Sequence, residues 1–355
     1  MAKARLTIDL GAIVANWRAL DIRSGSTVET AAVLKANAYG LGIAKVAPAL
    51  AQAGVHTFFV ALAEEGAELR GVLGPDPEIY ILSGLMPGDA AILEDHKLIP
   101  CLNSREQVEE FTAKLKGLPC AVQIDSGMNR LGIEPKDFID LSSTLIELRP
   151  KLVISHLACA DLPAHPLNTE QLRVFGATCT ALSGTKRSLA ATGGILLGPD
   201  YHFDLVRPGI GLFGGLPFLD AGPVVKLALP VIQVRDVEPG EVVGYGARWE
   251  ALKPARIATV SAGYADGLIR RTGNGNVHLY AGSKACSLVG RVSMDLITVD
   301  VTGLADVPSH LEILNAHQGI DDLAQAAGTI GYEFLTSLGQ RYDYRYIEPA
   351  TPAGK

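Results

Sequence analysis

The chain has 355 residues, of which 48% are hydrophobic and 19% are charged, so it can bury a large core and is not an intrinsically disordered protein. This length exceeds one small domain and fits two domains, or a barrel with a second domain. The formal net charge of −7 argues against nucleic acid as the main partner and provides no basic face for anionic lipid.

Targeting and redox features indicate the cytoplasm. No apolar run reaches about 18 residues, so we expect no transmembrane helix. The opening residues, MAKARLTIDLGAI, lack the apolar segment of a secretory signal. The five cysteines are widely spaced, with no CxxC pair and no cluster with histidine, so we expect no disulfide framework and no metal site.

The first two-thirds of the chain alternate strand-like and helical stretches. Asp9 is the expected N-cap of a first helix, because Leu10, Ile13, Val14 and Trp17 follow at helical spacing. Stretches such as 43–53 and 168–182 are also expected to be helices. Eight short apolar runs read as strands: 31–34, 57–61, 78–82, 97–101, 120–125, 151–156, 187–191 and 203–207.

This alternation predicts a parallel sheet covered by helices, because strands buried on both faces are apolar throughout. Eight such units indicate an α/β fold, a (β/α)8 barrel of the TIM type, over residues 1–226. A doubly wound open sheet is the alternative, but no GxGxxG opens a helix after the first strand.

The pattern changes near residue 222. Turn residues, and no long helices, separate the strand-like runs 227–237, 241–245, 255–262, 276–280, 286–292 and 296–301. One helical stretch at 320–338 follows. This predicts a β-rich C-terminal domain over residues 227–355.

Polar side chains stand at the expected carboxyl ends of the barrel strands, where barrels of this type carry their active sites. They are Lys35, Arg130, His156, Ser188 and Arg207. Each alone could be an ordinary loop or core residue. Their convergence on one end of a barrel favours a site.

A phosphate-binding turn is expected after the eighth strand. Glycine at Gly209 would expose backbone N–H groups at Gly209 and Ile210, with Ser188 nearby on the seventh strand. A phosphate site beside Lys35 suggests pyridoxal phosphate, since lysine supplies an amine and the cofactor an electron sink.

Six segments in both domains resemble the alanine racemase family. The segment AVLKANAYG at 32–40 is similar to that family's cofactor-lysine motif. Five others match in the same order: DSGMNRLG at 125–132, VRPGI at 206–210, VGYG at 243–246, GYADG at 263–267 and VGRVSMD at 289–295. The resemblance implies a pyridoxal-phosphate-dependent isomerase that interconverts L-alanine and D-alanine and, in bacteria, supplies D-alanine for peptidoglycan. It also implies a homodimer with shared active sites.

The resemblance further implies residue roles. Lys35 would bind the cofactor and move the α-proton on the D side, and Tyr245 from the partner subunit would do so on the L side. Arg130 and Met294 would contact the substrate, and Tyr264 would line the entrance. Cofactor contacts would come from Lys35, Tyr39, His156, Ser188, Arg207, Gly209, Ile210 and Tyr332.

Elementary chemistry supports two of these roles. Arginine has a pKa above ~12 and cannot hand a proton to a pyridine nitrogen, so Arg207 would leave the ring a weaker electron sink. Tyrosine has a free pKa of ~10, so Tyr245 needs cationic neighbours, such as His156 and Arg207, to act as a base.

One position departs from the family pattern. Many members carry a carbamate-modified lysine seven residues before the arginine that matches Arg130, and Gln123 stands there in this chain. A neutral amide cannot balance the charge of a guanidinium. We therefore expect no carbamate, and a bound anion such as chloride could take its place.

Three alternatives stay open on the sequence alone. One is a related racemase of broader substrate range, because nothing in the sequence fixes the size of the pocket. A second is an amino-acid decarboxylase of the same two-domain plan, which the motifs of the second domain disfavour. The third is a barrel that binds pyridoxal phosphate without catalysis, which would have no need of Tyr245 and Met294.

Overall fold

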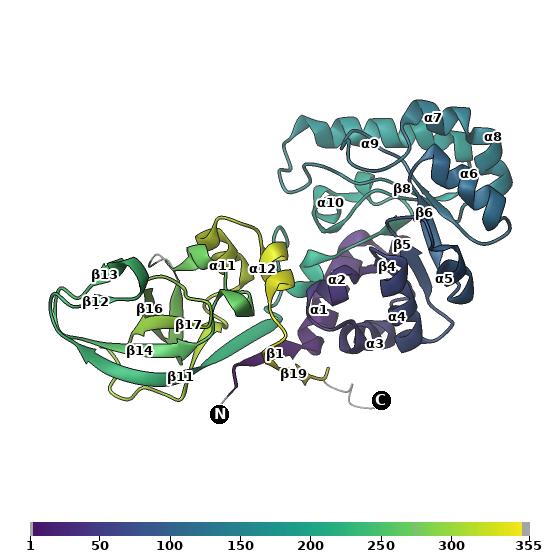
Figure 1. Ribbon diagram of the computed structural model, residues 1–355. Coiled ribbons are helices and arrows are strands. Elements are labelled where there is room, and N and C mark those ends of the chain that lie inside the picture. Colours follow the sequence, from purple (N-terminus) through teal and green to yellow (C-terminus); the bar gives the residue numbers. More distant parts are fainter. Residues whose placement is uncertain (1–2, 274, 276, 350–355) are drawn as a thin grey trace. The chain divides into compact units, whose positions relative to one another are not determined.

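A computed structural model describes residues 3–273, 275 and 277–349 (Figure 1). The chain forms two compact units. The barrel unit takes residues 13–212 and 216–221, and the β-rich unit takes the residues up to 12, residues 213–215 and those from 222 on. None of the helices in the described ranges is long and apolar enough to cross a membrane.

The barrel unit is a parallel sheet surrounded by helices (Figure 1). Neighbouring strands in this sheet are also successive in the chain, as a (β/α)8 barrel requires. They are β3 (Ala32–Val33), β4 (Thr57–Val60), β5 (Glu78–Ile81), β6 (Ile99–Leu102), β7 (Ala121–Gln123), β8 (Leu152–Ile154) and β9 (Lys186–Ser188). All seven lie within the expected runs or overlap them.

The last strand closes the barrel. β10 (Leu205–Val206) pairs in parallel with β2 (Glu29–Thr30), which runs on into β3. On its other side, Arg207 forms a parallel bridge with Ala191, just after β9. With β2 and β3 counted as one strand, the described residues thus form a closed ring of eight, and the predicted fold class is confirmed.

The helices connect successive strands across the outside of the barrel. Asp9 Oδ1 accepts a hydrogen bond from the Ala12 N–H at 2.9 Å, which confirms the expected cap of the first helix. The helices are α1 (Leu10–Ser24), α3 (Ile43–Ala53), α4 (Ala63–Leu73), α5 (Ala90–Asp95), α6 (Arg105–Lys114), α7 (Pro135–Asp140), α8 (Ser142–Leu148), α9 (Pro166–Cys179) and α10 (Thr192–Leu197). The short segment α2 (Lys35–Tyr39) is a turn with left-handed backbone angles. The short 3-10 turn η3 (Ile210–Phe213) follows β10.

The β-rich unit contains an antiparallel sheet that closes on itself. In the ring, β11 (Val225–Val237) pairs with β14 (Ala255–Ser261), and the order continues through β17 (Leu296–Asp300), β16 (Lys284–Val289), β15 (His278–Ala281) and β18 (His310–Leu314) back to β11. A small hairpin of β12 (Val242–Val243) and β13 (Trp249–Glu250) is separate. The expected β-rich character of this half is confirmed, although Asn276 of one expected strand lies outside the described residues.

The first strand of the chain belongs to this unit, whereas the sequence analysis had assigned residues 1–226 to the barrel. β1 (Arg5–Asp9) pairs antiparallel with β11 and parallel with β19 (Asp343–Ile347). Its alternate residues Leu6 and Ile8 are fully buried. Strand pairing and burial therefore place β1 with partners that follow it by more than 200 residues.

The expected helix at 320–338 is two helices. α11 (Ile320–Ala327) ends at Gly328, whose φ of 71° lies in the left-handed region that terminates helices. α12 (Gly331–Ser337) begins three residues later. A similar glycine signal explains why the expected strand 241–245 is short, because Gly244 has a φ of 76° and leads into the 3-10 turn η4 (Tyr245–Ala247).

Candidate active site

Lys35 lies directly after β3, at the carboxyl end of the barrel, as predicted. The side chain is half-buried. Burial and the nearby charge of Arg130 lower the pKa of Lys35 below its ordinary value, while Glu65 opposes this shift. A larger share of this lysine is therefore neutral and nucleophilic near pH 7 than for a solvent-exposed lysine.

The residues after Lys35 form a left-handed turn. Ala36, Asn37, Ala38 and Tyr39 have φ values between 53° and 56°. The turn brings the hydroxyl of Tyr39 against Gly209, where a Cβ atom would stand 2.3 Å from the hydroxyl oxygen. Only glycine allows this approach, so the two segments that the sequence predicted for phosphate binding do meet.

Thr192 stands at this junction and was missed by the sequence analysis. Its Oγ1 accepts hydrogen bonds from the N–H groups of Gly209 at 3.1 Å and Gly211 at 3.2 Å. It is the first residue of α10, just beyond the carboxyl end of β9. Its position four residues after Ser188, beyond the end of a barrel strand, is the sequence signal that marks Thr192 as a site residue.

Ser188 has other contacts than those expected of a phosphate ligand. Its hydroxyl donates to the carbonyl of Leu205 at 2.5 Å and accepts from Nη1 of Arg207 at 2.5 Å, and the residue is fully buried. The side chain therefore supports Arg207. These contacts favour Thr192 over Ser188 as the hydroxyl that would contact a phosphate at the Gly209 turn.

Arg207 is a buried cation bound by neutral oxygens. Nη1 also donates to the carbonyl of Ser188 at 2.8 Å, and Nη2 donates to the carbonyl of Ser155 at 2.6 Å. Burial lowers the pKa of Arg207 to about 10, which leaves it protonated at neutral pH. No carboxylate among the described residues pairs with it, so its positive charge is available to the site.

His156 follows β8 within reach of the same charges. Burial, followed by the charges of Arg207 and Arg130, lowers the pKa of His156 to about 3. The imidazole is therefore neutral near pH 7. Its backbone is fixed by Gln171 of α9, whose Nε2 donates to the carbonyl of His156 at 2.9 Å.

Arg130 is exposed on a loop that is fixed at its base. Asp125 Oδ1 accepts from three successive N–H groups, those of Gly127, Met128 and Asn129, at 2.8 to 3.1 Å. Gln123, where many family members carry lysine, donates from Nε2 to the carbonyl of Leu131 at 2.8 Å. The amide thus supports the backbone beside Arg130.

The other predicted residues lie in the β-rich unit. Tyr245, Tyr264 and Met294 are 70%, 43% and 53% exposed. Two of their turns are joined, because the Tyr264 N–H donates to the carbonyl of Ser293 and the Ala265 N–H to that of Met294, both at 3.0 Å.

Further contacts fix these turns. Arg341 binds Asp266 through Nε at 2.6 Å and Asp295 through Nη1 at 2.8 Å. The Tyr245 turn packs against the same segment, since a Cβ at Gly246 would be 3.6 Å from the Arg291 guanidinium. Tyr332 is half-buried in the first turn of α12.

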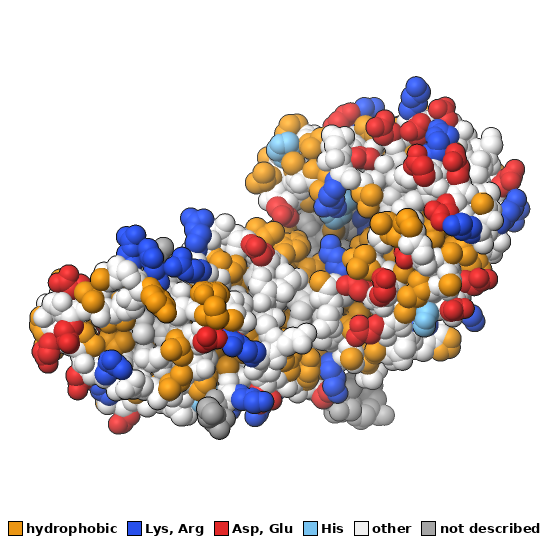
Figure 2. Space-filling model, in the orientation of Figure 1, with side chains coloured by type: hydrophobic (Ala, Val, Ile, Leu, Met, Phe, Trp, Pro, Cys, Tyr) orange, Lys and Arg blue, Asp and Glu red, His pale blue; other side chains and the backbone are white. Residues whose placement is uncertain are grey.

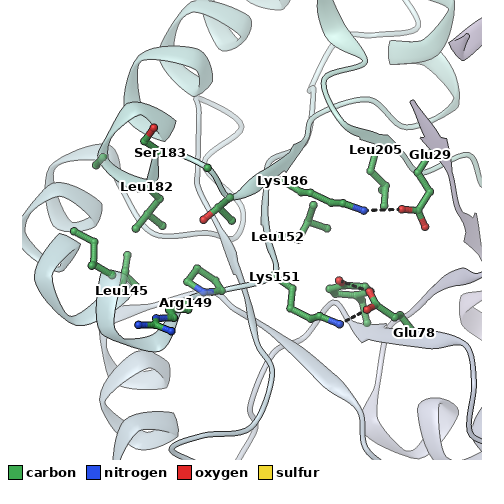
Figure 3. Close-up of a pocket in the computed structure, with 16 residues that line it drawn as sticks. Glu29, Glu78, Leu145, Arg149, Lys151, Leu152, Leu182, Ser183, Lys186 and Leu205 are labelled. Carbon is green, nitrogen blue, oxygen red and sulfur yellow. Dashed lines mark hydrogen bonds and ion pairs between the residues drawn. The ribbon is translucent and has the colours of Figure 1, made fainter. Parts of the chain in front are cut away.

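The amino end of the barrel has a different character. A cavity of about 690 Å³ opens there, and Lys151 points toward Glu78 and Lys186 toward Glu29 (Figure 3). The Lys186 Nζ to Glu29 Oε2 distance is 3.1 Å. Figure 2 shows acidic and basic side chains interspersed over the visible face of the barrel unit. No group of three or more His, Cys, Asp or Glu side chains in the described ranges could hold a metal ion.

A closed barrel with a half-buried lysine at its carboxyl end, followed by a β-rich unit, is typical of two-domain barrel enzymes. The domain models of one family match both parts: "Alanine racemase, N-terminal domain" at residues 8–217 and "Alanine racemase, C-terminal domain" at 224–346. The chain belongs to the alanine racemase family and is an enzyme of the racemase class.

Individual relatives agree. An alanine racemase of Cereibacter sphaeroides is 60% identical and covers 98% of this chain and 99% of its own. One of Rhizobium meliloti is 44% identical, covering 98% and 97%. The crystal structure of the Bartonella henselae alanine racemase, described with covalently bound pyridoxal phosphate, has a TM-score of 0.92 and 39% identity, covering 98% of this chain and all of its own. The biosynthetic alanine racemase of Pseudomonas aeruginosa has a TM-score of 0.91 and 38% identity, with the same coverage.

Proposed function

We propose that this protein interconverts L-alanine and D-alanine with pyridoxal phosphate bound to Lys35. The observation that carries the proposal is the half-buried Lys35, with a lowered pKa, in a site shared with the unpaired cation Arg207. The names of the relatives support alanine as the substrate, and the Bartonella henselae structure supports the cofactor.

The donor set fits pyridoxal phosphate. A phosphate ester carries close to two negative charges at neutral pH and takes several hydrogen bonds. The Tyr39 hydroxyl, the Thr192 hydroxyl and the Ile210 N–H can supply them. Gly209 leaves room for a close approach, and its own N–H, which donates to Thr192 Oγ1 at 3.1 Å, holds that hydroxyl at the turn. Thr192 replaces Ser188 in this set, and Tyr332 remains a proposed contributor.

When bound, the cofactor withdraws electrons from the α-carbon of the amino acid and so acidifies its α-hydrogen. The chain's own groups then move the proton. Once the substrate amine has displaced Lys35 from the cofactor, Lys35 Nζ would accept or return the proton on the D side, a role that its lowered pKa favours. The Arg130 guanidinium binds the substrate carboxylate, for which its two parallel N–H groups are suited.

The proton on the L side is assigned to the Tyr245 hydroxyl of a second copy of the chain. Tyr245, Tyr264 and Met294 are exposed apolar side chains on fixed turns of the β-rich unit, which supports their being covered by another surface. We therefore propose a homodimer in which residues 227–355 complete the site of the partner's barrel. Because His156 is neutral, the nearby cation for the Tyr245 phenolate is Arg207.

We place this activity in the cytoplasm, where it would supply D-alanine for peptidoglycan. The remaining alternative is broader substrate specificity. A coupled assay of D-alanine formation from L-alanine tests the activity, and the same assay with serine and lysine as substrates tests its breadth. No turnover of any amino acid by cofactor-loaded protein would exclude the proposal.

Borohydride treatment of the cofactor-loaded protein, followed by peptide mapping, tests the cofactor assignment. The label is expected on Lys35. A label on another lysine would exclude Lys35 as the point of attachment, whatever the activity of the enzyme.

Tyr245→Phe tests the second base, since it removes only the hydroxyl. Racemisation should fall by at least about 10²-fold, while α-hydrogen exchange in deuterated water should stay faster for D-alanine than for L-alanine. Mixing this variant with Lys35→Ala should restore one active site per heterodimer. Equal loss of exchange for both enantiomers would contradict the assignment of faces.

A further inference from the structure

The turn after Lys35 has a backbone that its residues do not favour. Ala36, Asn37, Ala38 and Tyr39 all have φ between 53° and 56°. L-residues avoid this left-handed region because the Cβ atom approaches the following carbonyl oxygen, and only glycine, asparagine and aspartate enter it routinely, as single residues. Four in succession, of which one is an asparagine, require contacts from outside the turn.

The far side of the turn is held within its own segment. The Gly40 N–H donates to the carbonyl of Ala36 at 2.8 Å, and the Gly42 N–H to that of Asn37 at 3.0 Å. The side chain of Asn37 accepts from the Ile43 N–H at 2.7 Å. These bonds connect the turn to the start of α3.

The side next to Lys35 is held by one carboxylate from another element. The Ala36 N–H donates to Oε1 of Glu65 at 2.6 Å. The second oxygen of Glu65 accepts from the N–H groups of Ala61 at 2.8 Å and Leu62 at 3.3 Å, at the start of α4. Glu65 therefore links the residue after the lysine to the carboxyl end of the neighbouring strand β4.

We propose that Glu65 is a positioning residue, which holds the left-handed turn and thereby fixes Lys35 and the Tyr39 hydroxyl relative to each other. The inference rests on the proposed function, in which Lys35 carries the cofactor and Tyr39 contacts its phosphate. Glu65 acts through the backbone of Ala36 and takes no part in proton transfer. The charged groups that act on Lys35 are Glu65 itself and Arg130.

The first test compares two neighbouring glutamates. Glu65→Ala should weaken binding of pyridoxal phosphate to the apoprotein by about 10-fold or more, since charge-assisted hydrogen bonds to backbone N–H groups are lost. Hydrogen exchange of the amides at 36–42 should become faster. Glu64→Ala is the matched control. Glu64 is exposed in the same helical turn, and its substitution also removes one negative charge. It should leave both measurements within about twofold of wild type.

The second test separates backbone positioning from a charge effect on Lys35. Ala36 is exposed, so Ala36→Gly removes little packing and makes its φ of 53° favourable. The double variant Ala36→Gly/Glu65→Ala should bind the cofactor several-fold more tightly than Glu65→Ala and have a several-fold higher kcat. The KM for L-alanine should change less than kcat. Failure of glycine to restore affinity would overturn the positioning role.

The outcomes distinguish this inference from the proposed function. A borohydride label on Lys35 of the wild type, with Glu65→Ala indistinguishable from Glu64→Ala, would overturn the role of Glu65 and leave the function intact. A wild-type label on another lysine would remove the function and this inference together. If Glu65→Ala loses its far-UV circular dichroism, Glu65→Gln, which retains one acceptor oxygen, replaces it in the same comparisons.

Discussion

The two ends of the barrel both carry lysine and arginine, but the partners of these cations differ. At the amino end, Lys151 pairs with Glu78 and Lys186 with Glu29 (Figure 3). At the carboxyl end, the hydrogen-bond partners of Arg207 within the described chain are neutral oxygens, and burial together with the charge of Arg130 lowers the pKa of Lys35. The amino end pairs its lysines with carboxylates, whereas Arg207 at the carboxyl end has no carboxylate partner among the described residues.

This difference indicates what each end does. Exposed ion pairs contribute about 0–1 kcal/mol each to stability and hold the strand starts together. Buried cations without carboxylates are electrostatically unfavourable until an anion binds. Under the proposed function, this charge would favour the binding of phosphate and carboxylate groups at the carboxyl end of the barrel. Four comparisons between variants can test the contrast.

The largest expected effect is on catalysis. Lys35→Ala should lower racemase activity by at least about 10³-fold, because it removes both the cofactor attachment and one base. Lys151→Ala, at the amino end, should keep activity within about twofold. Equal losses in the coupled D-alanine assay would show that the two ends do not differ in function.

Stability should respond more modestly. Arg207→Gln removes donors from the buried carbonyls of Ser155 and Ser188 and should lower the free energy of unfolding by about 2–3 kcal/mol. Lys186→Gln breaks an exposed pair and should cost under about 1 kcal/mol. Urea denaturation of the apoprotein measures both, and a larger loss for Lys186→Gln would reverse the comparison.

A smaller effect is expected in the acid range. Burial alone would raise the pKa of Glu78, but hydrogen bonds from Lys151 and Tyr80 outweigh it and the pKa is lowered. The pair therefore stabilises the fold above the ordinary pKa of glutamate, and this contribution disappears as the pH falls through the lowered pKa. Lys151→Met should be less stable than wild type by up to about 1 kcal/mol at pH 7.

That stability difference should shrink as the pH falls below the ordinary pKa of glutamate, and it should vanish once Glu78 is protonated in the folded protein. Lys116→Met, at an exposed lysine of the same unit, is the control. A difference that persists unchanged in acid would mean that packing of the Lys151 stem, and not its charge, is responsible.

The smallest effect concerns His156. After burial and Arg207, the charge of Arg130 lowers the pKa of this imidazole. Arg130→Gln should therefore raise the pKa of His156 above about 3. The pKa should stay below the ordinary value of histidine, because burial and the charge of Arg207 remain. Histidine NMR of the apoprotein measures the midpoint, and Arg149→Gln, at the amino end, should leave it unchanged. A downward shift with Arg130→Gln would contradict the placement of these cations.

Much of the barrel and its lysine could be predicted from the sequence, because apolar runs and the carboxyl-end rule depend on local patterns. Contacts between residues far apart in the sequence could not be predicted in this way. Glu65 lies 29 residues from Ala36, and nothing near either residue indicates their bond. The left-handed turn is equally hidden, since alanine and tyrosine ordinarily favour negative φ.

Side-chain direction was the other limit. Ser188 and Thr192 are both hydroxyl residues near the end of the seventh barrel strand, and the sequence does not say which one points toward Arg207 and which toward Gly209. The strand ends at Ser188, so its hydroxyl lies within the barrel wall and bonds to Leu205 of β10. Such a choice depends on strand register, which only the three-dimensional structure reveals.

The pairing of β1 with β11 and β19 has a consequence for how the protein is made on the ribosome. Residues 13–212 and 216–221 form the barrel unit, so most of that unit can fold as the chain emerges. β1 is translated before the barrel unit, whereas its partners at Val225–Ala228 and Asp343–Ile347 are translated after it. β1 is therefore without its partner strands while the barrel unit is synthesised, and its parallel partner β19 becomes available only after the other strands of the β-rich unit have been translated.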